Sequence, residues 1–195
     1  AYAPIDFGAK RYCEARVWSF FNKWAAEDMK PYMPYAMGED VDPETKQAIE
    51  GIPHEMPLWV KPKQLLSTQD VKDMMRDHYE GTPMDITEGL GGLPWQMPYR
   101  VTPLSYKVDG KEYFNERPIS TVQSSAIYVA QMRDWLPDYI GGVLWFGNDD
   151  ANMVALTPIY SCLESVPECY SSKLANATTF NFRNAYWMCN WVSNM

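Results

Sequence analysis

The spacing of prolines in residues 30–63 is the strongest constraint that the sequence places on the fold. Proline fixes its own φ angle, has no amide hydrogen to donate, and disfavours the helical conformation in the residue before it. We therefore expect an irregular segment that wraps the surface. A short helix over residues 43–49 is compatible with the pattern, with Asp42 as its N-cap. The prolines are Pro31, Pro34, Pro43, Pro53, Pro57 and Pro62.

Amphipathic periodicity predicts a helix just before this segment. In residues 11–27 apolar side chains recur at helical spacing, while charged side chains occupy other positions. We expect this helix to pack against a large core, with Cys13 on its buried face as a small hydrophobic residue. The expected buried face consists of Cys13, Val17, Phe20, Phe21 and Trp24.

A second helix is predicted over the sequence STQDVKDMMRDHYEG. Ser67 or Thr68 provides its N-cap, and Gly81 ends it. His78 is expected beside its C-terminal end, where a cation complements the helix dipole. This structural role is favoured over a catalytic one, because no second histidine or cysteine has helix-compatible spacing to it. The expected apolar face consists of Val71, Met74, Met75 and Tyr79.

Strand signals dominate the second half of the chain, after a Gly- and Pro-rich loop. In YKVDGKEYF, Asp109 and Gly110 form the turn of a predicted hairpin. Residues 178–192 are apolar nearly all round, which predicts a helix sandwiched between layers. Helices flanking a mainly antiparallel sheet predict an α+β architecture. Three further strands are expected within residues 119–133, 141–147 and 152–160.

Composition narrows the classes of function. With 195 residues, 46% of them hydrophobic, the chain is the size of one large domain. Its net charge of -8 argues against binding to nucleic acid, because such proteins present a basic surface. The cysteines form no CxxC pair and the two histidines are far apart, so we expect no metal site. Cys162 and Cys169 flank a turn, and free thiols are favoured there over a disulfide.

Five separated segments share their character with one family. They are, in order, DFGAKRYCEARVW, MMRDHYEGTPMDIT, ERPISTVQSS, VAQMRDWLPDYIGGVLWFGNDD and AYWMCNWVSN. Together they resemble the C69 dipeptidases, which belong to the N-terminal-nucleophile hydrolases. The resemblance runs over essentially the whole chain and meets the motifs in order. It implies an αββα sandwich, similar in fold to bile-salt hydrolase and penicillin acylase.

This resemblance implies a specific chemistry, the hydrolysis of dipeptides. An N-terminal cysteine exposed by processing is the nucleophile, and its own α-amino group accepts the thiol proton. Side-chain amides and backbone N–H groups stabilise the tetrahedral oxyanion, and water then hydrolyses the thioester. No cofactor is required.

The chain departs from the family pattern at its first residue. Ala1 has no nucleophilic side chain, and Cys13 cannot replace the family's cysteine because it has no free amine of its own. The resemblance therefore implies that residues 1–195 are an internal segment of a larger peptidase domain, truncated at both ends. Its partners would be the remainder of the parent polypeptide and a dipeptide. We expect no catalytic residue within this chain, and we expect the chain alone to be inactive.

Two segments contain candidate substrate-binding residues. In NERPISTVQSS, related hydrolases place an arginine at the start of a comparable strand, so Arg117 would hold a substrate carboxylate. An ion pair of Arg117 with Glu116 or a neighbouring acid is an equally good interpretation. Ser120, Thr121 and Gln123 would offer hydrogen bonds to the peptide.

In WFGNDDAN, the adjacent polar side chains Asn148, Asp149 and Asp150 would bind a substrate ammonium. The same cluster at a turn between strands also caps backbone groups, and this interpretation is favoured. Calcium is a third alternative, for which the stretch has too few oxygen ligands at loop spacing.

Other classes of function remain open. A non-catalytic peptide- or carbohydrate-binding module would explain the 8 Trp, 13 Tyr and 7 Phe. A structural role is a further alternative, in which apolar segments such as the last helix pair with another copy to form a homo-oligomer.

Overall fold

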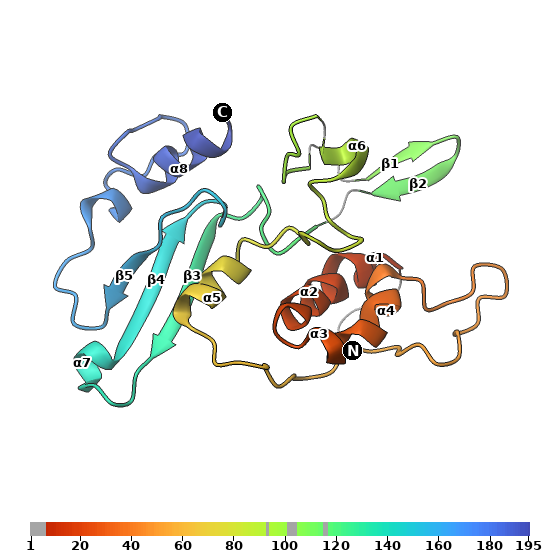
Figure 1. The fold of residues 1–195 in the computed structure, drawn as a ribbon. Coiled ribbons are helices and arrows are strands. Elements are labelled where there is room, and N and C mark those ends of the chain that lie inside the picture. The colour runs from red at the N-terminus through yellow and green to blue at the C-terminus, as the bar shows by residue number, and fades with distance from the viewer. Residues whose placement is uncertain (1–6, 93, 101–104, 115–116) are drawn as a thin grey trace. The chain divides into compact units, whose positions relative to one another are not determined.

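The computed structural model describes residues 7–92, 94–100, 105–114 and 117–195 (Figure 1). The chain divides into two compact units. The first comprises residues 1–66 and 77–119, and the second comprises residues 67–76 and 120–195. Short helices accompany antiparallel sheets, which confirms the α+β class. The expectation that residues 1–195 are one segment of a larger domain stays a prediction.

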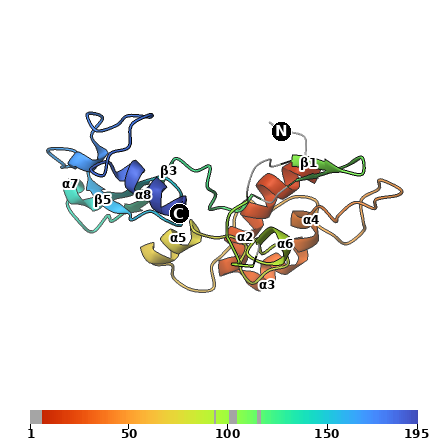
Figure 2. The same ribbon diagram turned by 90° about the horizontal axis from the view of Figure 1, so that it is seen from above.

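A series of short helices opens the first unit. It comprises α1 (Phe7–Ala9), the π-helix η1 (Lys10–Glu14), α2 (Ala15–Trp24), α3 (Ala26–Met29), the 3-10 helix η2 (Lys30–Tyr32) and α4 (Met33–Met37). Figures 1 and 2 show α2 beside α4. Helical structure thus extends into the proline-rich segment. It does so because Pro31 and Pro34 occupy first-turn positions, where the missing N–H costs nothing.

The buried face of α2 differs from the expected one. Ala15, Trp18 and Ser19 are buried, whereas Cys13 and Val17 are exposed, so the packing role predicted for Cys13 is wrong. The Trp18 indole N–H donates to the Met29 carbonyl oxygen at 2.9 Å, which turns this side of the helix inward. The core of the unit consists of Ala15, Trp18, Met29, Ala36, Tyr79, Met84 and Ile86.

A buried ion pair joins η1 to Asp40, which lies three residues after the end of α4. The Lys10 Nζ lies 2.5 Å from Asp40 Oδ1 and 2.7 Å from Asp40 Oδ2. His54 Nδ1 lies 3.0 Å from the same carboxylate, on its Oδ2. Burial alone would raise the pKa of Asp40, but the hydrogen bonds from Lys10 and His54 outweigh it and lower the pKa below its ordinary value.

The short helix expected over residues 43–49 is absent from the described structure, and that prediction is wrong. Val41 and Ala48 instead form an isolated antiparallel bridge. Asp42 does act as a local cap, since its Oδ1 accepts the backbone N–H groups of Glu44 at 2.9 Å and Thr45 at 2.6 Å. These bonds stabilise a turn in place of a helix, because the chain doubles back to form the bridge.

The remainder of the first unit contains α6 (Gly89–Gly92) and a hairpin of β1 (Ser105–Val108) and β2 (Lys111–Phe114). Asp109 and Gly110 both have positive φ angles, 50° and 78°, as the predicted two-residue turn requires. No helix of the described residues is long and apolar enough to cross a membrane.

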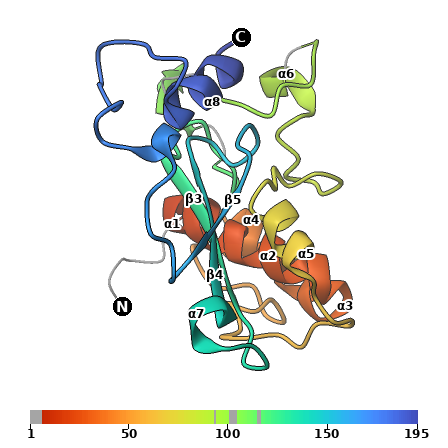
Figure 3. The same ribbon diagram turned by 90° about the vertical axis from the view of Figure 1, so that its left-hand side faces the viewer.

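In the second unit, a three-stranded antiparallel sheet has the order β3 (Ala126–Met132), β4 (Gly142–Asn148) and β5 (Thr157–Tyr160). Figure 3 shows the strands together with α5 (Thr68–Met74) and α8 (Ala185–Ser193). The short helix α7 (Asp138–Gly141) precedes β4, and the 3-10 helix η3 (Glu168–Tyr170) follows β5. The predicted strands are confirmed, but β3 and β5 are shorter than the segments that predicted them, and β4 begins and ends one residue later than its segment.

One face of this sheet packs against α5. The Lys72 Nζ lies 3.1 Å from the centroid of the Trp145 ring, and Arg76 donates to the carbonyl oxygens of Ala151 and Val154 at 3.0 and 3.1 Å. Ser67 forms a capping box with Asp70, so the N-terminal prediction for this helix is confirmed.

The predicted C-terminal end of that helix is wrong. The helix ends at Met74, and His78 lies beyond it, buried, with its Nδ1 2.9 Å from Glu80 Oε1. Burial of the Glu80 carboxyl opposes ionisation, but hydrogen bonds from the His78 ring and backbone outweigh it and lower the pKa of Glu80 to about 2. A neighbouring carboxylate, not a helix dipole, therefore accompanies His78.

The last helix is shorter and more exposed than expected. It begins at Ala185, because Asn184 takes the N-cap position and accepts the Trp187 backbone N–H at 3.1 Å. Phe180 and Phe182 precede it outside the helix, and both are exposed, as is Trp191. In the described structure, this helix is therefore not sandwiched between two layers.

Candidate functional site

The end of β4 places three consecutive residues in different environments. A Cβ on Gly147 would lie 2.6 Å from Val154 Cγ2, so any larger residue here would force Val154 to shift. Asn148 follows as the last residue of the strand, paired with Ala126. Asp149 then has a φ of 93°, a left-handed conformation that turns the chain sharply out of the sheet. Local packing thus determines the position of Asn148.

Hydrogen bonds from α8 hold the Asp149 side chain. Its Oδ1 accepts from Asn190 Nδ2 at 3.4 Å, and its Oδ2 accepts from Ser193 Oγ at 3.2 Å. The Asp149 backbone N–H donates to the Ser125 carbonyl oxygen at 2.9 Å. Burial raises the pKa of Asp149 above its ordinary value, although the bonds from Asn190 and Ser193 act in the opposite direction.

The structure joins Ser120 and Asp150, which come from the two candidate segments. Both residues are fully buried, and Ser120 Oγ–H donates to Asp150 Oδ1 at 2.7 Å. The same oxygen accepts the Asn152 backbone N–H at 3.3 Å. This bond fixes the start of the β3 segment to the turn after β4. A substrate ammonium bound by Asp149 and Asp150 stays a prediction.

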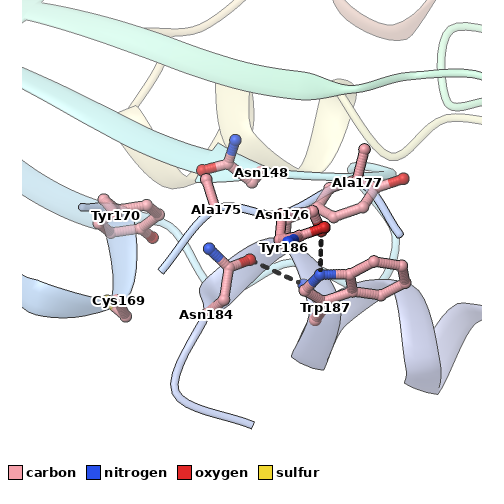
Figure 4. A pocket seen from close by; sticks show the side chains of 9 residues that line it. All are labelled: Asn148, Cys169, Tyr170, Ala175, Asn176, Ala177, Asn184, Tyr186 and Trp187. Atoms are coloured by element: carbon pink, nitrogen blue, oxygen red, sulfur yellow. Dashed lines mark hydrogen bonds between the residues drawn. The ribbon is translucent and has the colours of Figure 1, made fainter. Parts of the chain in front are cut away.

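A cavity of about 490 Å³ opens beside Asn148 (Figure 4). Ligand sites in proteins commonly have volumes in the range of about 300 to 1,000 Å³. The end of β4, η3, the loop after it and the start of α8 form its walls. The lining residues are Asn148, Cys169, Tyr170, Ala175, Asn176, Ala177, Asn184, Tyr186 and Trp187.

All three side-chain amides in this lining, those of Asn148, Asn176 and Asn184, have hydrogen-bonding groups without a partner among the described residues. The Asn148 amide makes no hydrogen bond to any residue that the structure describes. Asn184 uses its Oδ1 for the helix cap, which leaves its Nδ2 hydrogens without a partner among the described residues. Amide hydrogens of this kind are suited to bind a carbonyl oxygen or a carboxylate.

The other predicted residues lie outside this cavity. Arg117 belongs to the first unit, where its guanidinium carbon lies 5.7 Å from the centroid of the Tyr12 ring. Its Nε is buried without a hydrogen-bond partner in the described structure. Glu116, the alternative partner of Arg117, lies outside the described residues. Thr121 Oγ1 lies 3.4 Å from Ser124 Oγ, and Gln123 is exposed.

Sequence reasoning missed the residues that α8 contributes. Tyr186 and Trp187 line the cavity, and Asn190 and Ser193 hold Asp149. The one available signal was the asparagine at position 184, directly before an apolar helical pattern, which is typical of an N-cap. With Asn184 as the N-cap, the predicted helix would begin at Ala185, and Tyr186 and Trp187 would lie in its first turn.

The thiols show no arrangement typical of a nucleophile and its base. All four cysteines are free, as favoured for Cys162 and Cys169. Burial, followed by the charge of Asp149, raises the pKa of Cys189 and disfavours its thiolate. Among the described residues, no cluster of His, Cys, Asp and Glu could hold a metal ion.

Comparison with known proteins identifies relatives over most of the chain. It is 25% identical to dipeptidase A of Lactobacillus helveticus over 134 residues, which cover 69% of this chain and 24% of that protein. It is 26% identical to a probable dipeptidase of Latilactobacillus sakei over 148 residues, which cover 76% of this chain and 26% of that protein. The matched part therefore spans about a quarter of the length of these relatives.

The family assignment rests on a longer match. The profile described as Peptidase family C69 matches residues 1–195, which is every residue of this chain. A probable dipeptidase B of Lactococcus lactis is similar as well, with 25% identity over 136 residues that cover 69% of this chain and 24% of that protein. The chain belongs to peptidase family C69.

Proposed function

We propose that the full-length protein hydrolyses dipeptides by attack of a cysteine thiolate, and that the end of β4 binds the peptide. Membership of family C69 and the names of the related dipeptidases support the reaction. The single observation that carries the site is the Asn148 amide, which lines a cavity and makes no hydrogen bond within the described structure.

The proposed nucleophile is an N-terminal cysteine outside residues 1–195, as in N-terminal-nucleophile hydrolases. A free α-amino group has a pKa of about 7.7 to 8.0, so near neutral pH it accepts the thiol proton. The cysteines of this chain are poorer candidates. Cys13 and Cys162 are exposed on the surface, and Cys189 has a raised pKa. We expect the isolated 195-residue chain to lack dipeptidase activity.

Asn148 would contribute to catalysis as a hydrogen-bond donor. When the thiolate attacks the peptide carbonyl, the oxygen becomes negatively charged, and a donor already in position stabilises that charge. Asp149 and the Ser120–Asp150 hydrogen bond would hold the turn, which keeps the amide in position without large rearrangement. Losing one such donor typically lowers kcat by about 10²- to 10³-fold.

Kinetics of the full-length protein test this proposal. Asn148→Ala is expected to lower kcat for alanyl-alanine by about 10²-fold with a smaller change in KM. Replacing the mature N-terminal cysteine with alanine is expected to abolish turnover. Gln64→Ala removes an exposed amide elsewhere and serves as the matched control. Full activity of the cysteine variant would refute the mechanism, and full activity of Asn148→Ala would refute the role of Asn148.

A second candidate function is a binding module without catalysis, favoured by the aromatic rings of Tyr186 and Trp187 in the cavity. Peptides and sugars commonly bind against such rings. This alternative predicts saturable binding of a dipeptide or a sugar by the full-length protein, with no hydrolysis over many hours. Detectable turnover that depends on the N-terminal cysteine would exclude it.

A further inference from the structure

We propose that the cavity beside Asn148 is a side-chain subsite for an uncharged aromatic or bulky apolar residue of the substrate. This inference rests on the proposed function, and it concerns which substrates the same site selects. The cavity volume of about 490 Å³ exceeds what a methyl or hydroxymethyl side chain fills. A large side chain would therefore bury more apolar surface there than a small one, which favours its binding.

The lining carries no side chain that is charged at neutral pH. It consists of amides, alanines, aromatic rings and one thiol, Cys169. A lysine or glutamate side chain that entered would lose its hydration without meeting a countercharge, which is unfavourable. The charged ends of a dipeptide must be bound outside this cavity for the same reason.

Charged residues adjoin the lining in the sequence, but none of them is part of it. Glu168 and Arg183, which adjoin Cys169 and Asn184, form an exposed ion pair with each other. The Asp149 carboxylate, next to Asn148, accepts hydrogen bonds from Asn190 and Ser193. Glu168 and Arg183 therefore offer no unpaired charge, and Asp149 lies outside the lining with both carboxylate oxygens engaged by α8.

The aromatic walls are held in place by their own contacts. The Trp187 indole N–H donates to the Asn176 carbonyl oxygen at 2.9 Å, as Figure 4 shows. Tyr170 OH lies 3.0 Å from Thr157 Oγ1, and the Tyr170 ring meets Phe146 edge-on at 5.4 Å. Rings that are already ordered lose little conformational freedom when a ligand binds, so such walls favour binding of another ring.

The test compares dipeptides that differ in one side chain, using the full-length protein. We expect kcat/KM for alanyl-phenylalanine or phenylalanyl-alanine to exceed that of the matching lysine and glutamate peptides by about tenfold or more. Tyr186→Glu places a charge in the wall at a helix N-terminus, where a carboxylate is tolerated. We expect it to change the phenylalanine-to-lysine ratio by about tenfold in favour of lysine, while Tyr186→Phe leaves the ratio unchanged.

Tyr139→Glu, at an exposed position of α7 away from the cavity lining, is the matched control and is expected to leave the ratio unchanged. Equal kcat/KM values for phenylalanine and lysine peptides, with no shift in Tyr186→Glu, would overturn the subsite while leaving the proposed function intact.

A binding measurement that needs no turnover separates the two proposals. Equilibrium dialysis with N-acetyl-tryptophanamide and N-acetyl-lysinamide is expected to show preferential binding of the former, reduced in Tyr186→Glu. Preferential binding in a protein that hydrolyses no dipeptide would refute the function alone, and no preference would overturn the subsite.

Discussion

Replacing Asp40 with asparagine tests how strongly the buried ion pair of the first unit stabilises the fold. Asp40 is 1% exposed and Lys10 is 7% exposed, so Asp40→Asn leaves a buried ammonium without a countercharge. Removing one partner of such a pair costs about 3 to 5 kcal/mol in the free energy of unfolding. His54→Gln removes the partially exposed partner and should cost at most about 1 kcal/mol.

The pH dependence has a defined sign. Since the pKa of Asp40 is lowered in the folded state, its ionised form contributes stability above the unfolded pKa of about 3.9, and this contribution is lost as the pH falls through the lower folded pKa. The Asp40→Asn variant has no ionisable group at this position, so its stability has no such contribution to lose at low pH. The difference in unfolding free energy between wild type and variant should therefore be largest near neutral pH and shrink below about pH 4.

Urea denaturation of the protein, followed by circular dichroism from pH 3 to pH 8, measures these differences. Asp28→Asn, which neutralises an exposed carboxylate, is the matched control and should stay within about 0.5 kcal/mol of the wild type. The double variant Lys10→Met with Asp40→Leu removes both charges and should be much closer to the wild type than Asp40→Asn alone. A loss under about 1 kcal/mol in Asp40→Asn, unchanged between pH 3 and pH 7, would refute the reasoning.

Two further predictions concern the end of β4. Gly147→Ala places a Cβ 2.6 Å from Val154 Cγ2 and should reduce the free energy of unfolding by about 1 to 3 kcal/mol, measured by urea denaturation. Gly142→Ala is the control, because the nearest atoms to its Cβ lie at 3.8 Å, and an equal loss in both variants would contradict the steric argument. Asp149 has a raised pKa, so wild-type stability should fall as the pH rises from the ordinary to the raised value. Asp149→Asn should lack this pH-dependent loss of stability, and asparagine tolerates the positive φ at this position. Identical pH profiles of stability for the wild type and the variant would contradict the assignment to Asp149.

Local signals predicted most elements but not their ends. The hairpin was predictable because Asp109 and Gly110 tolerate the backbone angles that its turn requires. The N-terminus of α5 was predictable because Ser67 and Asp70 satisfy each other within four residues. Its C-terminus was not predictable, because His78 leaves the helical path to pair with Glu80 and become buried.

The candidate site was predictable in part. Local sequence and resemblance identify Asn148 and Ser120 as candidates. Asn148 lines the cavity, and Ser120 donates a hydrogen bond to Asp150 in the turn after β4. The role of α8 was not predictable, since Asn190 meets Asp149 across 41 positions of the chain. Periodicity could not identify such a partner, because it describes only how one element repeats.

By itself, the sequence determined the α+β class, the turn residues, the acidic charge and the segments that resemble family C69. These properties depend on backbone preferences and side-chain chemistry within a few neighbouring residues. Only the tertiary structure decided that α2 buries Trp18 and not Cys13, that Asp150 bonds Ser120, and that an uncharged cavity lies beside Asn148. Each of these depends on contacts between distant segments, whose packing selects among faces and partners that are locally equivalent.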